Sequence, residues 1–165
     1  MKAPICDICL RSSMLCSACN EKLASGSISS ADVEVSRAVF EESERIKALR
    51  GVTIRKVIET PKAVIILPQK GDASSLIGRG GMVSKALTKK LGKNVRVVEQ
   101  APDMKDFIEN LIFPYKVSAI NVLYSSEGES LKAIVPDIRR SPVPEPGLRK
   151  AVEEIYGKRI RFVSE

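Results

Sequence analysis

The first long pattern of hydrophobic and polar residues in the chain is that of an amphipathic helix. Between Val33 and Leu49, apolar residues recur every three to four positions and therefore share one face of a helix. Ser29, followed three residues later by Asp32, forms a capping-box pattern at the start, and Gly51 stands just past the end. The sequence therefore predicts a helix that runs to about Leu49.

The hydrophobic pattern then changes to that of strands and shorter helices. Residues 52–60 alternate between apolar and polar, residues 63–67 are continuously aliphatic, and Pro61-Lys62 between them indicates a hairpin turn. A short helix is predicted at residues 73–77, with Asp72 as its N-cap. The last elements of this half are an amphipathic helix and a strand, at residues 82–91 and 94–99.

The second half of the chain repeats this order. The segment LGKNVRVV at Leu91–Val98 returns as YGKRIRFV at Tyr156–Val163, which is 65 residues later. The elements predicted before this second copy are a helix, two strands and a helix, at residues 106–115, 117–125, 131–136 and 147–156. We therefore predict an α+β protein made of a duplicated helix–strand–strand–helix–helix–strand module, at residues 29–100 and 101–165.

The positive charge of the chain is concentrated in the first copy. The 165 residues carry a net charge of +7, from 27 Lys and Arg against 20 Asp and Glu. Ten of these basic residues but only three of the acidic ones lie within residues 52–99, whereas the segments on either side are each neutral. Such a local excess indicates a polyanionic partner better than a general solubilising surface does.

All four cysteines lie in the first nineteen residues, with the spacing C-x2-C-x6-C-x2-C: Cys6, Cys9, Cys16 and Cys19. Because each CxxC turn aims two thiolates at one tetrahedral ion, residues 1–28 are predicted to form a module around one structural zinc ion per chain. Disulfides, a thioredoxin-like redox site and an iron–sulfur cluster are the alternatives, and each lacks its usual context here. Four cysteine ligands leave no open coordination position for a catalytic water.

The segment LIGRGGMV, Leu76–Val83, combines three glycines with an arginine. Such a loop lets a phosphate approach the backbone closely. A dinucleotide-binding turn is disfavoured because ten residues separate the loop from the preceding strand, and a P-loop is disfavoured because GK[ST] is missing. A ligand-free corner between two helices remains an alternative, although it leaves the surrounding charge unexplained.

A GxxG loop between two helices, preceded by an aliphatic residue and followed by a basic amphipathic helix, resembles the KH domain. IGRGG at Ile77–Gly81 and the downstream LGKNVRVVE carry the resemblance, and the order of elements is similar to that of type II KH domains. The duplication and the segment FIENLIFPYKVSAINV are similar to the paired KH domains of the NusA family. With the cysteines in front, the chain resembles archaeal NusA-like proteins, and the KH resemblance covers residues 31–165.

The resemblance implies that about four nucleotides of single-stranded RNA are clamped along the glycine loop, with the bases in an aliphatic groove. The candidate RNA-binding residues are Ile77, Gly78, Arg79, Gly80, Gly81, Val83, Lys85 and Lys89. The second copy has Val143-Pro144-Glu145-Pro146 where the GxxG would stand, so no binding residues are carried over to it.

The sequence therefore predicts a single-stranded RNA-binding protein that serves transcription elongation or termination, with RNA polymerase or the ribosome as a protein partner. A ribosome-biogenesis or RNA-processing factor, and an adaptor that docks through the cysteine module, are the alternatives. The chain has no histidine and shows no nucleophile–base pattern, so we expect no enzymatic activity and no small-molecule cofactor. The start MKAPICDIC has no signal-peptide pattern and no run is long enough to cross a membrane, so we expect a cytoplasmic protein.

Overall fold

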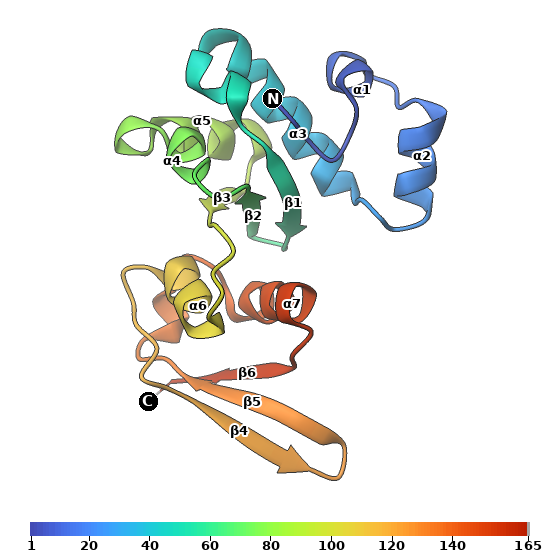
Figure 1. Ribbon diagram of the computed structural model, residues 1–165. Coiled ribbons are helices and arrows are strands. Elements are labelled where there is room, and N and C mark those ends of the chain that lie inside the picture. The colour runs from blue at the N-terminus through green and yellow to red at the C-terminus, as the bar shows by residue number, and fades with distance from the viewer. Residues whose placement is uncertain (165) are drawn as a thin grey trace. The chain divides into compact units, whose positions relative to one another are not determined.

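The computed structural model describes residues 1–164 (Figure 1). The chain has a mixed α+β fold that divides into two compact units, each with its own three-stranded sheet. The first unit comprises residues 1–59 and 64–99, and the second comprises residues 60–63 and the chain from residue 100 onward. The α+β class expected from the sequence is therefore confirmed.

The first unit begins with two short helices, α1 (Asp7–Arg11) and α2 (Ser17–Ala24). The elements that follow are α3 (Ser30–Arg45), a 3₁₀ helix η1 (Lys47–Gly51), β1 (Ile54–Glu59), β2 (Ala63–Pro68), α4 (Ala73–Ile77), a 3₁₀ turn η2 (Arg79–Gly81), α5 (Met82–Leu91) and β3 (Asn94–Val97). The strands lie in the order β1-β2-β3, and β1 pairs antiparallel with β2. This is the order of elements that the hydrophobic pattern predicts.

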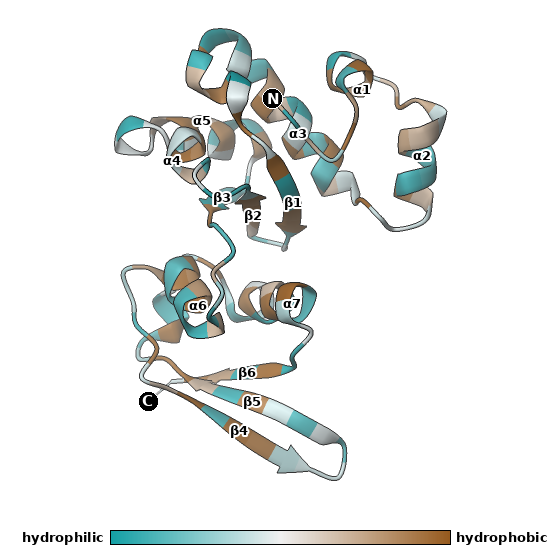
Figure 2. Cartoon of the chain, viewed as in Figure 1, coloured by the Kyte–Doolittle hydropathy of each residue, from teal (hydrophilic) through white to brown (hydrophobic). Residues whose placement is uncertain are grey.

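The core of the first unit forms where α3, α4 and α5 pack against this sheet. Its buried side chains include Val35, Val39, Leu49, Val57, Ile66, Leu76, Val83 and Leu87. All six residues of β2 are buried, and Figure 2 shows the hydrophobic colouring of this strand. Because both faces of this strand are buried, residues 63–67 do not alternate between apolar and polar side chains.

Asp32 links the start of α3 to the sheet. Its Oδ2 accepts a hydrogen bond from the backbone N–H of Ser29, and the hydroxyl of Ser29 accepts one from the N–H of Asp32, so the predicted capping box is present. Its Oδ1 accepts a further bond of 2.8 Å from the N–H of Val57 in β1. A carboxylate that is only 4% exposed is thereby fully hydrogen-bonded, as burial requires.

The structure corrects two predictions in the first unit: the end of one helix, for a local reason, and one helix cap, because of a contact with a distant residue. The helix expected to reach Leu49 ends at Arg45, because Ile46 takes an extended conformation and the chain continues as η1. This change of direction places Leu49 in the core with no exposed surface. Asp72 does precede α4, but its side chain accepts from the N–H of Thr53 and makes no capping bond.

The second unit contains α6 (Met104–Ile112), β4 (Ala119–Ser125), β5 (Gly128–Ile134), a 3₁₀ turn η3 (Ile138–Arg140), α7 (Glu145–Tyr156) and β6 (Ile160–Val163). Its sheet has the order β4-β5-β6, with β4 and β5 antiparallel and β5 and β6 parallel. The rings of Phe107 and Tyr156 meet edge to face at 5.6 Å between centroids and join α6 to α7. The second unit thus repeats the order of the first, with η3 in the place of α4.

Candidate metal site and glycine-rich loop

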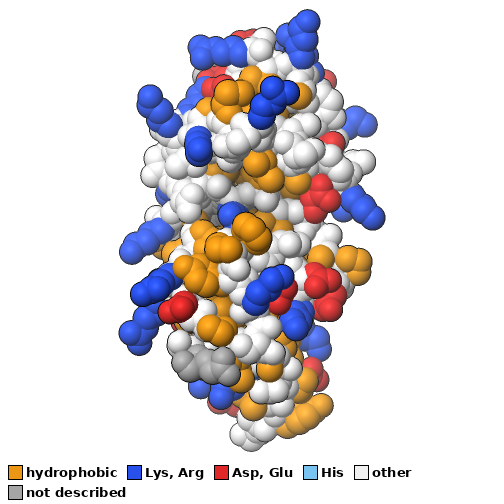
Figure 3. Space-filling view, turned by 90° about the vertical axis from the view of Figure 1, so that its left-hand side faces the viewer, with side chains coloured by type: hydrophobic (Ala, Val, Ile, Leu, Met, Phe, Trp, Pro, Cys, Tyr) orange, Lys and Arg blue, Asp and Glu red, His pale blue; other side chains and the backbone are white. Residues whose placement is uncertain are grey.

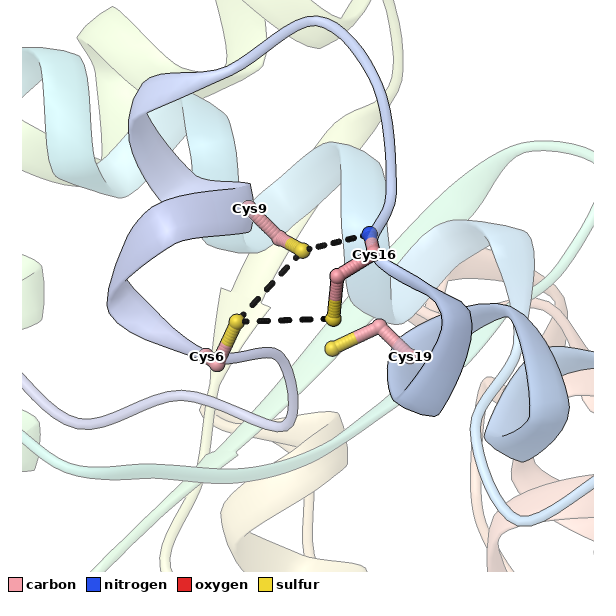
Figure 4. Close-up of side chains that lie close together, drawn as sticks. All are labelled: Cys6, Cys9, Cys16 and Cys19. Atoms are coloured by element: carbon pink, nitrogen blue, oxygen red, sulfur yellow. Dashed lines mark hydrogen bonds between the residues drawn. The ribbon is translucent and has the colours of Figure 1, made fainter.

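The four cysteine sulfur atoms lie together at the N-terminus, all within 4.8 Å of one another (Figure 4). The Sγ atom of Cys6 is 3.4 Å from that of Cys9 and 3.9 Å from that of Cys16. A tetrahedral ion with metal–sulfur bonds of about 2.3 Å requires sulfur–sulfur separations of about 3.8 Å. The observed distances therefore fit one tetrahedral metal ion.

The local backbone explains how two CxxC segments produce this geometry. Cys6 and Cys16 are the N-cap residues of α1 and α2, and Cys9 and Cys19 lie three residues further on, in the first turn of each helix. Both pairs therefore stand where backbone N–H groups have no partner within the helix. The N–H of Cys16 donates to the Sγ of Cys9 over 3.1 Å, as Figure 4 shows.

The crowding of the four sulfur atoms moves the pKa values of Cys6 and Cys9 in opposite directions. Hydrogen bonds from Cys9, the strongest from its backbone N–H, lower the pKa of Cys6 to about 7. For Cys9, the backbone N–H of Cys16 lowers the pKa, but burial and the three neighbouring thiols outweigh it and raise the pKa to about 12. Four thiolates need a cation to coexist, so metal binding releases protons and strengthens as the pH rises.

The cysteine module, residues 1–28, is attached to the rest of the first unit by three kinds of contact. The Nε of Arg37 in α3 donates to the backbone oxygen of Cys9 over 3.1 Å. The guanidinium of Arg11 lies 5.5 Å from the ring centroid of Phe40. Backbone hydrogen bonds also join Lys2 to the segment before β1. The module and α3 therefore form one packed body, whose shared core includes Ile5, Leu10 and Val33.

The glycine loop has the backbone that only glycines adopt readily. The φ angles of Gly78, Gly80 and Gly81 are 75°, 61° and 75°. Gly81 is the N-cap of α5, and no side chain among residues 1–164 makes a capping hydrogen bond there. The N-terminus of α5 is thus open to an external anion, which its dipole favours.

The three glycines differ in the space around them. A Cβ atom on Gly78 would lie 2.5 Å from the Cγ2 and 2.9 Å from the backbone nitrogen of Val83. A Cβ on Gly80 would meet no atom within 4 Å. Gly78 is therefore required for packing as well as for its φ angle, whereas Gly80 faces open space.

We expect Gly78→Ala to lower the free energy of unfolding of the first unit by about 3 kcal/mol, because it adds a backbone clash to an unfavourable φ angle. Gly80→Ala is the matched control, and we expect it to cost about 1 kcal/mol from its φ angle alone. Urea unfolding followed by circular dichroism measures both. Equal losses in the two variants would contradict the close packing of Gly78 on Val83.

The predicted RNA-binding residues are divided between the surface and the core. Arg79, Lys85 and Lys89 are exposed. None of the three forms a salt bridge with another of residues 1–164. Ile77 is 38% exposed, whereas Val83 is only 1% exposed and packs under Gly78. Figure 3 shows Lys and Arg side chains projecting around hydrophobic ones in the upper part of the view, where the first unit lies.

Three residues near these sites were not predicted from the sequence. Glu99 caps α4, because its Oε1 accepts from the N–H groups of Gly71 and Ala73 over 2.7 and 3.2 Å. Met82 is 59% exposed beside the loop. Arg37 holds the module, as described above. None of the three has a local signal that marks it, since each acquires its contact or exposure from the fold.

The corresponding segment of the second unit has a different structure. Pro144 is the N-cap of α7, and Pro146 lies in its first turn, where the missing N–H is tolerated. Glu145 is paired with Arg149 over 2.6 Å. Pro146 removes one N–H group from the start of α7 and Glu145 places a carboxylate there, so this helix start is unsuited to a phosphate.

The chain is similar in sequence to two archaeal proteins. No protein-family model matches it. The probable transcription termination protein NusA of Methanococcus vannielii is 28% identical over 113 residues, which are 65% of this chain and 64% of that protein. The protein of the same name from Methanocaldococcus jannaschii is 28% identical over 102 residues, 60% of this chain and 55% of that protein. The chain therefore matches less than two thirds of the length of either relative.

The chain is also similar to solved structures, in sequence and in fold. The crystal structure of APE1850 superposes with a TM-score of 0.52 and 26% sequence identity. The superposition covers 76% of this chain and 96% of that one.

Within residues 1–164, no helix is both long and apolar enough to cross a bilayer.

Proposed function

We propose that this chain is a single-stranded RNA-binding protein of the NusA type, which acts in transcription elongation or termination. The observation that carries the proposal is the loop of three positive-φ glycines before the uncapped N-terminus of α5. The similarity to two archaeal proteins named probable transcription termination protein NusA supports the proposed role in transcription. RNA polymerase or the ribosome is the protein partner that fits this role.

In this proposal, each unit contains a type II KH domain, at residues 29–100 and 101–165. The order of α3, β1, β2, α4, α5 and β3 agrees with the type II arrangement, and the second unit has the same order with η3 in place of α4. Only the first domain grips RNA, because the second has Pro144 and the Glu145–Arg149 pair at the equivalent position.

The grip follows from the geometry of the loop. A sugar–phosphate backbone packs on the glycine backbone at residues 78–81, and a phosphate faces the N-terminus of α5. The free cations of Arg79, Lys85 and Lys89 neutralise neighbouring phosphates. Ile77 provides an exposed aliphatic surface for a base, and Val83 supports the loop from below.

The metal in this proposal is one structural zinc ion held by Cys6, Cys9, Cys16 and Cys19. When bound, zinc supplies the positive charge that stabilises four neighbouring thiolates, and it takes no part in a reaction. The protein is a non-enzymatic factor of the cytoplasm, with no small-molecule cofactor.

Salt titration of RNA binding tests the proposed grip. Because three side chains neutralise phosphates, we expect the logarithm of the association constant to fall with that of the salt concentration with a slope of about −2. Fluorescence anisotropy with a labelled single-stranded oligonucleotide measures it, and Lys85→Gln should make the slope shallower by about 0.7. An absence of binding at low salt, or a slope near zero, would refute the proposal.

A further inference from the structure

The three-stranded sheet of the second unit has one face that helices cover and one face that they leave open (Figure 1). Leu131 of β5 and Ile160 of β6 are buried, so they lie on the face that α6 and α7 cover. Because side chains alternate between the two faces of a strand, Lys132 and Arg161 lie on the opposite face. We call this the outer face; it consists of every second residue of each strand, in phase with the cross-strand row of Asn121, Lys132 and Arg161.

Three cations lie together on the outer face. Lys132 and Arg161 are partners in the register of β5 and β6, and Arg159 continues the alternation two residues before Arg161, about 6.6 Å along the strand direction. Both arginines are exposed, and Lys132 is half-buried. None of the three forms a salt bridge with another of residues 1–164, whereas Lys116 and Arg149 of the same unit do. The outer face therefore carries three unpaired positive charges.

No carboxylate balances this charge from the outer face itself. Within residues 1–164, the outward positions of β4, β5 and β6 contain no Asp or Glu. Glu129 of β5 has the opposite alternation and pairs with Lys158 over 3.2 Å. Residues 100–165 contain equal numbers of acidic and basic side chains, so the charges of this half are separated in space although they cancel in sum. A count of charge along the sequence therefore does not reveal the outer face.

The arrangement of Lys132 and Arg161 is unfavourable in the free protein. Like charges directly opposite each other on neighbouring strands destabilise a sheet. An anion that lies across β5 and β6 removes this repulsion, because it attracts both cations. The backbone of β5 offers such a ligand no hydrogen bonds, since it is paired with β4 on one side and with β6 on the other. Recognition at this face therefore depends on side-chain charges.

We propose that the outer face of the second sheet is a further contact for the phosphate backbone of single-stranded RNA, with phosphates on Lys132, Arg159 and Arg161. The identity of the ligand rests on the proposed function, in which the glycine loop holds another part of the same strand. The contact differs from the grip of that loop, which the second unit lacks at residues 143–146. Two contacts to one strand reinforce each other, because binding at the first raises the local concentration of RNA at the second.

The chemistry of the outer face indicates a contact that does not depend on RNA sequence. No aromatic ring occupies an outward position of the three strands within residues 1–164, so bases have no platform for stacking. Asn121, the cross-strand neighbour of Lys132, is an exposed amide that can bond to a phosphate or a ribose. Backbone contacts of this kind position a strand and do not read its bases.

A phosphate chain fits the outer face better than an acidic protein segment does. Every nucleotide carries a charge, so any register of the strand places phosphates near the three cations. A peptide has to supply several carboxylates in one particular register. The strand edges that hold peptides by backbone hydrogen bonds lie in the plane of the sheet, whereas the three cationic side chains project out of that plane.

A neighbouring hollow of about 690 Å³ marks the limit of the site. It is lined by Arg159 and Arg161, but also by carboxylates, which include those of Glu127 and Glu153. Like charges placed together are unfavourable, so these carboxylates repel phosphates. We therefore expect the RNA to cross the outer face beside Lys132 and not to enter the hollow.

The test compares two lengths of RNA on the full, zinc-loaded chain. Labelled random-sequence RNA of about four nucleotides fits the glycine loop alone, whereas RNA of about thirty nucleotides is long enough to occupy a second contact as well. The outer-face variant Lys132→Gln/Arg159→Gln/Arg161→Gln should bind the long RNA at least about tenfold more weakly at low salt, with a salt slope shallower by about 2, from three contacts of about 0.7 each. Its affinity for the short RNA should be unchanged. Fluorescence anisotropy measures both.

A matched control removes three other cations from the same unit. Lys116→Gln/Arg149→Gln/Lys158→Gln changes the net charge equally, but these side chains already pair with carboxylates. We expect this variant to lose less than about twofold in affinity for the long RNA. The outer-face variant relieves the repulsion between Lys132 and Arg161, so its thermal midpoint should be unchanged or higher, which shows that the second unit stays folded.

Three results separate the proposal from its alternatives. Equal losses in the two triple variants would show a response to net charge alone and would overturn it. Polyglutamate of the same charge that binds more tightly than the long RNA, and loses this affinity in the outer-face variant, would assign the face to an acidic protein segment. Failure of the short RNA to bind would refute the glycine-loop grip, whereas a loss of long-RNA binding in the outer-face variant only would still support the outer face.

Discussion

We expect the double substitution Arg79→Asp/Gly80→Asp to abolish binding of single-stranded RNA while the first unit stays folded. It replaces one cation by an anion and adds a second anion where a phosphate is proposed to lie, so affinity should fall at least about 100-fold. The loop accepts both changes, because Arg79 is exposed and a Cβ on Gly80 meets no atom within 4 Å. Asp is also one of the residues that best tolerate a positive φ angle.

Anisotropy with a labelled oligonucleotide measures the affinity, and circular dichroism measures the fold. The matched control is Arg79→Asn/Gly80→Asn, which keeps the size and backbone preference of the aspartates without their charge. This neutral pair should lose much less affinity, because only one cation is removed. Unchanged RNA affinity in the Asp pair would remove the glycine loop from the binding site and favour an adaptor function for the chain.

We expect removal of the metal to have the largest effect on stability. The buried residues of the module and the adjoining face of α3 form a small cluster, which is too little apolar surface to hold residues 1–28 in place alone. Structural zinc contributes about 10–16 kcal/mol to folding in isolated zinc fingers, which exceeds the stability of many whole domains. Cys9→Ser, at the fully buried cysteine, should therefore unfold the module and destabilise α3.

Hydrogen exchange with mass spectrometry locates this effect. Amides of α1, α2 and the N-terminal part of α3 should lose protection, whereas those of α6 and α7 should keep it, because the second unit has its own core. Ser17→Ala, an exposed neighbour of Cys16, is the control and should change neither metal content nor exchange. Metal analysis of the unaltered protein should find about one zinc per chain; iron, or no metal, would contradict the assignment.

Much of this protein can be predicted from its sequence because the signals are local. The order of elements follows from hydrophobic periods, and the capping box of α3 lies within four residues, so both are present as predicted. The CxxC spacing likewise predicts that four thiols gather at one site, and the structure places them within 4.8 Å of one another, although the short helices α1 and α2 that carry them were not predicted. Three glycines in four residues likewise predict a loop with positive φ angles before α5.

What only the tertiary structure decided involves partners distant in the chain. Asp72 was predicted to cap α4 because it is adjacent, yet Glu99 makes the capping bonds from 26 residues further on, since the fold brings β3 beside this helix. Val83 carries a binding pattern in the sequence but lies in the core, because the turn at Gly78 packs directly on it.

Arg37 shows the same division most clearly. In the sequence it is one charge among several on an amphipathic helix, and nothing nearby marks it. Only the packing of the cysteine module against α3 directs its Nε to the backbone oxygen of Cys9 and leaves the rest of its guanidinium without a carboxylate. The hydrophobic periodicity of helices and strands, the capping residues of α3 and the spacing of the metal-binding cysteines are short-range properties, which the sequence determines by itself. Burial and unsatisfied hydrogen-bonding groups depend on which distant segments meet, which only the folded chain decides.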